Sequence, residues 1–280
     1  MKKLLFAIAA MALLVACEKN EAEDWSDLNQ PQKRIAVIEE YTGINCGYCP
    51  EGHKIVNNIM KQNPGKVFAV NIHQGGYAAG TYTTTEGNAY AREAKVETYP
   101  SGSVNRHLFK NYSAVLAMSR GDFSAATKKI LDMASPVNIA ATASINKQTR
   151  ELKVKVRGYY TADAVDASEQ PLEKNSLYVL LLQDSVMGQQ SGASANPEQV
   201  IDGRYCHMHM LRASINGTWG EDIAPVTAGS HFVKEYTYSI PEKIGTDKVK
   251  AVLEHMKVLV FIAEGHKEIY TAAEPEIQFN

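Results

Sequence analysis

Residues 39–50, EEYTGINCGYCP, decide the fold of the first half of the chain, because they place a Cys-x-x-Cys pair between two different patterns. Before the pair, residues 35–38 form a short apolar run suited to a buried strand. After it, residues 49–62 repeat apolar side chains at helical spacing, and Pro50 fits the first turn of a helix. An Asn-Pro-Gly sequence at 63–65 ends that helix. The pattern therefore predicts a strand and a helix with the cysteines at their junction.

This junction gives the two cysteines different chemical roles. A helix N-terminus presents unpaired N–H groups and a positive partial charge, and both favour a thiolate at Cys46. Cys46 would attack a partner disulfide, and Cys49, one helical turn further and less exposed, would resolve the mixed disulfide. A Cys-x-x-Cys pair in this setting is typical of thiol–disulfide chemistry.

The flanking sequence continues the alternation of strand and helix. Residues 67–72 read as a second strand, which completes a strand–helix–strand unit, and residues 101–106 as a third. Residues 85–95 read as a helix, and residues 122–133 as another with Asp122 as a plausible N-cap. We therefore predict an α/β domain over residues 33–135.

After residue 135 the helical pattern largely disappears. About seven strand-like segments follow, mostly separated by Gly, Asn, Asp or Pro clusters, and residues 246–255 are a candidate helix. Such a series predicts an all-β, sandwich-like C-terminal domain over residues 136–280.

The start of the chain has the pattern of an export signal. Lys2 and Lys3 precede an uncharged apolar stretch, residues 4–16, that is too short to span a bilayer as a helix. Its end, Leu-Val-Ala-Cys17, resembles a bacterial lipobox, which implies cleavage before Cys17 and acylation of that cysteine. Residues 1–16 are thus predicted to be a lipoprotein signal peptide; a plain signal peptide with a chance cysteine is the alternative.

Residues 17–32 are predicted to be a lipidated acidic tether. Within them, residues 18–27 carry five acids and one lysine without an apolar period, which is typical of a solvated linker. Acids directly after a lipidated cysteine also resemble the surface-export signal of Bacteroidetes lipoproteins. One segment can serve both purposes.

Composition excludes some functions and leaves the chemistry open. The 29 Lys+Arg against 31 Asp+Glu give a net charge of −2, which provides no electrostatic case for a nucleic-acid partner. Four cysteines in 280 residues are too few for a disulfide-stapled scaffold. We predict no cofactor and no resident metal.

The first half of the chain resembles the thioredoxin fold, over about residues 33–135. The resemblance rests on the strand–CxxC–helix order and on the Gly47-Tyr48 pair, which is like that of periplasmic disulfide isomerases. It implies that Glu40 is the buried acid that relays the proton of the resolving cysteine. It also implies that Pro100 is the cis-proline that faces the CxxC and holds extended substrate backbone. Asn45, where such proteins carry Trp, departs from the pattern, as does the Tyr before Pro100.

Other uses of these cysteines remain open. A structural Cys46–Cys49 disulfide that never turns over is one, because the cell exterior is oxidising. Structural zinc is another, with His53, His73, Cys206 and His207 as candidate further ligands, although no second close-spaced pair exists. A c-type haem is excluded because Pro50 stands where the motif needs His.

Histidines and glycines elsewhere supply secondary candidates. His73 ends the second strand, at the same sheet edge as Cys46, where it would bias the thiolate electrostatically or lie exposed in a loop. The glycine-rich residues 75–80 follow as a flexible loop that could border a binding groove. Residues 205–215 read as a strand, whose alternation would put His207 and His209 on an outer face, where they would form a metal-binding pair or a polar pair. Cys206 would lie on the inner face as a buried, inert thiol.

The whole layout also resembles the small outer-membrane lipoprotein antigens of Porphyromonas and related Bacteroidetes. The lipobox, the acidic tether, the CxxC segment, the β-rich second half and residues 205–212 carry this resemblance. It implies an outer-membrane, lipid-anchored and surface-exposed location, and an adhesin or receptor role with a ligand bound at the CxxC edge or the β domain. The alternative is a membrane-tethered thiol–disulfide oxidoreductase that acts on extended polypeptide, with Cys46 as nucleophile.

Overall fold

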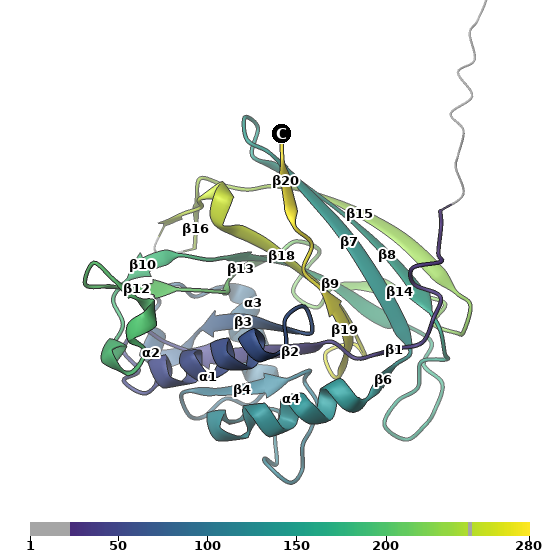
Figure 1. The fold of residues 1–280 in the computed structure, drawn as a ribbon, viewed down its shortest axis with the longest axis horizontal. Helices are drawn as coiled ribbons and strands as arrows, with labels where there is room; N and C mark the ends of the chain where they lie inside the picture. The colour runs from purple at the N-terminus through teal and green to yellow at the C-terminus, as the bar shows by residue number, and fades with distance from the viewer. Residues whose placement is uncertain (1–22, 246–247) are drawn as a thin grey trace, which may run out of the picture.

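A computed structural model describes residues 23–245 and 248–280 (Figure 1). Strand β2 (Ala36–Thr42), helix α1 (Cys49–Gln62) and strand β3 (Val67–His73) form the predicted strand–helix–strand unit. The two strands are parallel and pair along their full length, which brings their C-terminal ends to one edge. The strand and helix expectations for this part of the chain are confirmed, and the helix has the predicted bounds.

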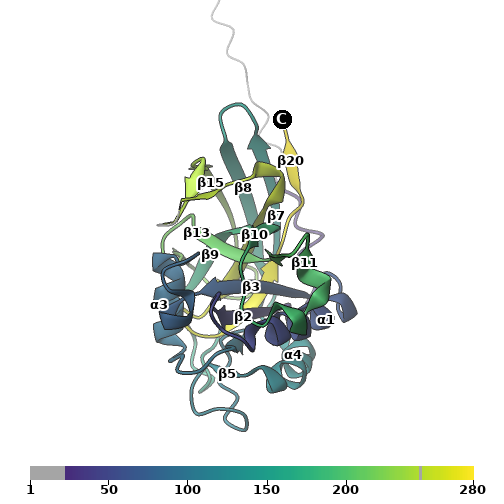
Figure 2. The ribbon, with the colours of Figure 1, turned by 90° about the vertical axis from the view of Figure 1, so that its left-hand side faces the viewer.

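Helices cover both faces of this part of the sheet. Alternate residues of β2 divide between them: Ala36 and Ile38 pack with α1 and with α4 (Phe123–Asp132), whereas Val37 and Tyr41 share a core with α3 (Thr85–Glu93). Figure 2 shows α3 on one side of β2 and β3, and α1 and α4 on the other. Helices α3 and α4 lie where the sequence predicted them, but the N-cap Asp122 makes no side-chain capping bond, since the 3₁₀ turn Arg120–Asp122 leads into α4.

A nine-stranded mixed sheet runs through the molecule. Its order is β19-β18-β9-β13-β3-β2-β4-β5, with β14 also paired to β9. The N-terminal members besides β2 and β3 are β4 (Ser101–Val104) and β5 (Met118–Ser119). The later members are β9 (Asn175–Gln183), β13 (Met210–Ser214), β14 (Glu221–Ile223), β18 (Met256–Ala263) and β19 (Ile269–Ala273). Strands from both sides of residue 135 therefore share one sheet, whereas the sequence suggested two separate units.

A second sheet packs on the end of the large one. It has the order β15-β8-β7-β20 and consists of His231–Ser239 (β15), Glu151–Tyr160 (β8), Val137–Asn146 (β7) and Ile277–Phe279 (β20). Leu177, Val179 and Leu181 of β9 point into the core between the two sheets, while the residues between them face the α3 side. The second half is thus sandwich-like, and the protein is mostly β with few helices.

A segment inserted between β9 and β13 lies beside α1. It consists of β10 (Val186–Gly188), two 3₁₀ turns (Ala193–Ala195 and Pro197–Gln199), β11 (Val200–Ile201) and β12 (Arg204–His207). We call residues 186–207 the strap. The sequence predicted one strand over 205–215, but β12 and β13 belong to different sheets, and the chain turns between them at His209, whose φ is 53°.

The predicted helix over 246–255 is also wrong where the structure describes it. Residues 249–250 form β17 (Val249–Lys250), paired with β16 (Lys243–Ile244), and Leu253–His255 form a 3₁₀ turn. Pairing between β16 and β17 provides hydrogen-bond partners for backbone groups that a helix would have paired internally.

The described part of the predicted tether is packed on the protein. Trp25 lies against Tyr159 and His231 of the second sheet, and the Asn138 side chain donates to the carbonyls of Leu28 (2.7 Å) and Gln30 (2.6 Å). β1 (Gln32–Lys33) then pairs with β6 (Ala134–Ser135). The expectation of a solvated linker is therefore corrected for residues 23–32, because its aromatic and apolar side chains find partners.

The predictions of a signal peptide over residues 1–16 and of lipidation at Cys17 lie outside the described residues. Among residues 23–245 and 248–280, no helix is long and apolar enough to cross a membrane.

Candidate functional site

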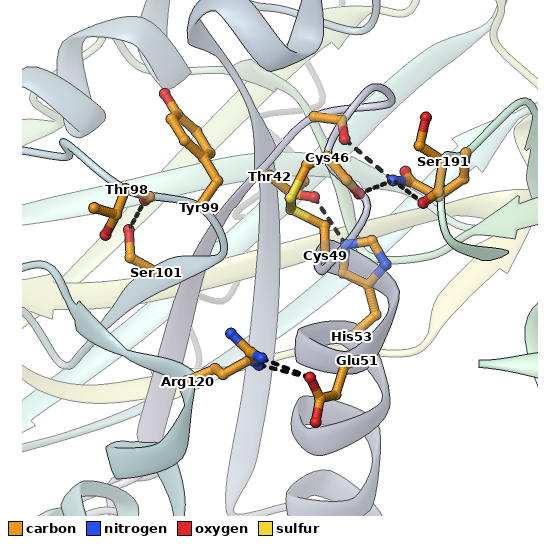
Figure 3. The surroundings of a disulfide bond; sticks show 12 residues. Thr42, Cys46, Cys49, Glu51, His53, Thr98, Tyr99, Ser101, Arg120 and Ser191 are labelled. Atoms are coloured by element: carbon orange, nitrogen blue, oxygen red, sulfur yellow. Dashed lines mark hydrogen bonds and ion pairs between the residues drawn. A yellow bond between two sulfur atoms is a disulfide. The ribbon is translucent and has the colours of Figure 1, made fainter. Parts of the chain in front are cut away.

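Cys46 and Cys49 form a disulfide at the start of α1, with their Cα atoms 5.4 Å apart (Figure 3). The loop before the helix is held by its own backbone, since Cys46 N donates to the Gly43 carbonyl at 3.0 Å and Cys49 N to the Cys46 carbonyl at 3.3 Å. Cys46 is 2% exposed and Cys49 is fully buried, whereas Tyr48 between them is 71% exposed. Both cysteines are therefore buried, although an exposed aromatic side chain stands between them.

Glu40 and Pro100 meet beneath the first turn of α1. The Tyr99–Pro100 bond is cis, as expected. A Cβ atom built on Gly52 would lie 2.4 Å from Glu40 Oε1 and 3.1 Å from Pro100 Cβ, so only a glycine allows all three to approach. The structure thus brings together Cys46, Cys49, Glu40 and Pro100, all chosen from the sequence.

The Glu40 carboxyl is buried and neither of its oxygens has a hydrogen-bond partner. Burial raises the pKa of Glu40 well above its usual value, because the interior disfavours the charged form. Its neighbour Glu39 faces the opposite side, where it forms an ion pair with Arg106 at 2.6 Å. Burial therefore favours the protonated form of Glu40, whereas Glu39 is held in a buried ion pair.

The strap covers the cysteine loop. The Gln190 side-chain amide donates to the carbonyls of Gly43 (3.1 Å) and Cys46 (3.0 Å), and Ser191 N donates to the Ile44 carbonyl at 2.8 Å. Figure 3 shows Ser191 of the strap beside Cys46. Gly192 lies so close to Gly47 that a Cβ atom on it would be 1.9 Å from the Gly47 oxygen. This cover comes from about 145 residues further along the chain, and no local pattern could have shown it.

A buried polar chain fastens the strap to α1. His53 Nε2 lies 2.9 Å from Thr42 Oγ1, and His53 Nδ1 lies 2.8 Å from the hydroxyl of Tyr205 in β12. That hydroxyl in turn donates to Gln199 at 2.8 Å. Burial lowers the pKa of His53 to about 3, so the imidazole is neutral and can donate through one nitrogen and accept through the other. Sequence reasoning considered His53 only as a zinc candidate and missed this structural role.

His73 is near the site but is neither exposed nor charged. It is 2% exposed, and its ring lies 5.2 Å from those of Tyr82 and His207. Burial lowers the pKa of His73 well below its usual value, and the pKa of His207 to about 4. A neutral imidazole offers no positive charge to a Cys46 thiolate, so neither predicted alternative for His73 fits.

The glycine-rich segment after β3 is folded against the cysteine loop. Gly75–Ala78 form a short helix, α2, and Asn45 N donates to the Tyr77 carbonyl at 2.9 Å. The half-exposed Tyr77 ring lies 5.2 Å from that of Tyr99. The expected flexible loop is thus a short helix that is bonded to the cysteine loop and packs its tyrosine ring on Tyr99.

His207 and His209 are both buried, although alternation on one strand predicted an outer face. The turn at His209 breaks that alternation. The free thiol of Cys206 is buried, as expected. In the described ranges, no three His, Cys, Asp or Glu side chains are grouped to hold a metal ion, so the zinc alternative, which used His53, His73, Cys206 and His207, lacks a ligand set there.

Comparison with known proteins gives a family and a fold. The family described as outer membrane protein Omp28 matches residues 87–268, which is 182 of the 280 residues and excludes the CxxC pair. The chain is similar in structure to HBP35 of Porphyromonas gingivalis, with a TM-score of 0.67 and 18% identity, over 88% of this chain and 76% of that one. An Agrobacterium tumefaciens protein matches with a TM-score of 0.49 and 13% identity, over 87% and 95%. No curated protein matches the chain.

Proposed function

Because the chain belongs to the Omp28 family of outer membrane proteins, we propose that it is an outer-membrane-associated protein that carries out thiol–disulfide exchange at Cys46 and Cys49. The N-terminal part of the sheet with α1, α3 and α4 would be its thioredoxin-like unit. One observation carries the proposal: the disulfide, the buried Glu40 carboxyl without a hydrogen-bond partner and cis-Pro100 converge on a single helical turn, although they come from three segments of the chain.

The exchange can be written with atoms and electrons balanced. A thiolate of a substrate dithiol attacks Cys46 Sγ, the Cys46–Cys49 bond breaks, and Cys49 leaves as a thiolate. Glu40 holds the proton that this thiolate takes up. The second substrate thiolate then displaces Cys46, so the substrate is oxidised by two electrons and the protein pair is reduced to the dithiol.

The substrate would bind as extended polypeptide. Two exposed tyrosines offer apolar contact in this region: Tyr48, which stands between the two cysteines, and Tyr77, whose ring lies 5.2 Å from that of Tyr99. An aromatic border is suited to a peptide side chain near the reacting sulfur.

The test is oxidation of a reduced, unfolded model protein, such as reduced ribonuclease A, by the intact chain. We expect activity that is abolished by Cys46→Ser and lowered by Glu40→Gln, while Cys206→Ser is the matched control that leaves it unchanged. Thiol trapping should show the Cys46–Cys49 pair becoming reduced in step with the substrate. If the Cys46–Cys49 pair stays oxidised in the presence of the reduced substrate, the proposal is refuted.

A second function is favoured by one specific observation. The strap leaves Cys46 only 2% exposed, which suits a closed structural disulfide in a binding protein. The protein would then be a surface-exposed, lipid-anchored adhesin or receptor, with its ligand at the β-rich half or at the CxxC edge.

This second function is tested by cell binding, which does not require the cysteines to react. The chain with both Cys46→Ser and Cys49→Ser should bind host or neighbouring cells as well as the wild type if it folds to the same stability. Surface exposure is tested by protease treatment of intact cells. Failure of the intact wild-type chain to bind any cell surface would count against adhesion and leave the redox proposal untouched.

A further inference from the structure

A cavity lined by sulfur-containing side chains lies beside the strap, and neither Cys46 nor Cys49 lines it. It has a volume of about 470 Å³ and lies between α1, the strap and the turn that leads into β13. Cys206, Met208 and His209 all line it. The turn at His209 brings its side chain to the same site as Cys206 and Met208, from which strand alternation would have separated it.

The two sulfur atoms are already close. Cys206 Sγ lies 3.7 Å from Met208 Sδ, and Ser185 N–H donates to the same thioether at 3.4 Å, which fixes its position. A metal–sulfur bond is usually about 2.3 Å long. If both sulfur atoms bound one ion at that length while staying 3.7 Å apart, the S–metal–S angle would be about 110°. That angle suits trigonal or tetrahedral coordination.

His209 can complete the set. It is buried, and its backbone N–H donates to Asp184 Oδ1 at 2.7 Å. The same carboxylate oxygen lies 3.4 Å from His209 Nδ1, and that nitrogen has no hydrogen-bond partner. A carboxylate beside one ring nitrogen is the arrangement that orients a metal-binding histidine and leaves the other nitrogen for the ion.

We propose that Cys206, Met208 and His209 form a binding site for a soft monovalent metal ion, Cu(I). Thiolate and thioether ligands select Cu(I), whereas zinc sites in proteins are built from Cys, His and carboxylates without thioethers. Binding forms one Cu–S bond to each sulfur, and the Cys206 thiol releases its proton to water. The exposed pair Lys61 and Glu198, from residues that also line the cavity, would lie where the ion enters.

The experiment is a Cu(I) titration of the full chain with Cys17→Ser, in which Cys206 is the remaining unpaired cysteine. Ascorbate keeps the copper reduced, and a colourless protein competes for the ion with a coloured Cu(I) chelator. We expect one equivalent to be retained. Cys206→Ser should abolish this retention, and Met208→Leu and His209→Gln should each weaken it at least tenfold.

Met133→Leu is the matched control, since it makes the same chemical change in a different core and should leave the affinity unchanged. If Cys206→Ser fails to fold, Met208→Leu still tests the site, because it keeps the volume of the side chain and removes only the sulfur. Absence of the bound equivalent, or an affinity unchanged in both Met208→Leu and His209→Gln, would overturn the proposal.

Discussion

Replacing Gly192 by Ala should release the strap from the cysteine loop and expose the disulfide to reductants. Gly192 has a φ of +70°, and its added Cβ atom would lie 1.9 Å from the carbonyl oxygen of Gly47. Both partners of that contact are backbone, so no side-chain rotation can relieve it. The strap must therefore move, and Cys46 must become more accessible.

The structure sets the size of the effect. Closure of the strap over the loop is stabilised by three hydrogen bonds from Gln190 and Ser191, worth about 2–4 kcal/mol together. An L-residue in the left-handed region costs about 1–2 kcal/mol before the collision is counted. A loss of about 2 kcal/mol from the closed state raises the population of the open state, and hence the rate of reduction, about 30-fold.

The assay follows reduction of Cys46–Cys49 by a water-soluble phosphine, with alkylation and mass spectrometry at timed intervals. Gly203→Ala is the matched control, because Gly203 belongs to the same strap and has a φ of +72°, but its Cβ atom would meet nothing within 4 Å. Urea unfolding of both variants separates strap opening from global unfolding. Equal rates in the two variants, or a Gly192→Ala rate within about twofold of the wild type, would refute control of access by the strap.

Three further outcomes are expected. Burial raises the pKa of Glu40, so the folded state keeps a proton that the unfolded state releases above about pH 4.3; the resulting stability is present below that pH and is lost as pH rises. The Glu40→Gln variant has no such group, so the difference between its unfolding free energy and that of the wild type should increase with pH. Urea titrations from about pH 5 upward should show an increase of up to about 1.4 kcal/mol per pH unit, and a difference that does not change with pH would contradict this. Arg106→Met should destabilise the fold by about 3–5 kcal/mol in the same assay, because it leaves Glu39 charged and unpaired, and adding Glu39→Gln should restore part of the loss. Cys17→Ser should move the protein from the membrane to the soluble fraction, and unchanged fractionation would argue against a lipid anchor.

Local signals in the sequence were sufficient to predict the strand–helix unit that carries the disulfide. The apolar run of β2, the helical period of α1 and the Asn-Pro-Gly stop each act over a few residues, so they predict that unit without knowledge of the rest. The burial of Glu40 and the cis bond before Pro100 came from the resemblance to thioredoxins. Both hold in the structure.

Long-range pairing was out of reach of the sequence. The boundary at residue 135 follows a real change from helical to strand patterns. A strand pattern, however, does not indicate which other strand it will pair with. Only the folded chain shows that β13 pairs in parallel with β3 and so joins the two halves. His209 is a similar case, because a non-glycine residue with positive φ carries no reliable signal, and its turn reversed the predicted environment of the two histidines.

The relation between strap and disulfide decides which function the protein can have. The reacting groups are encoded within and next to residues 39–52 and depend on local structure, whereas their cover, residues 186–207, belongs to the region that matches the Omp28 family. The cover is fastened on one side by Gln190 and on the other by the His53–Tyr205 bond, so it cannot open at one end without breaking a buried polar contact. An extended peptide can replace the Gln190 hydrogen bonds to the Gly43 and Cys46 carbonyls with its own backbone N–H groups, whereas a small thiol reaches the disulfide only when the strap opens by itself. Selection of polypeptide over small thiols would thus follow from the strap itself, and a closed strap that no peptide displaces would leave the disulfide as a structural link.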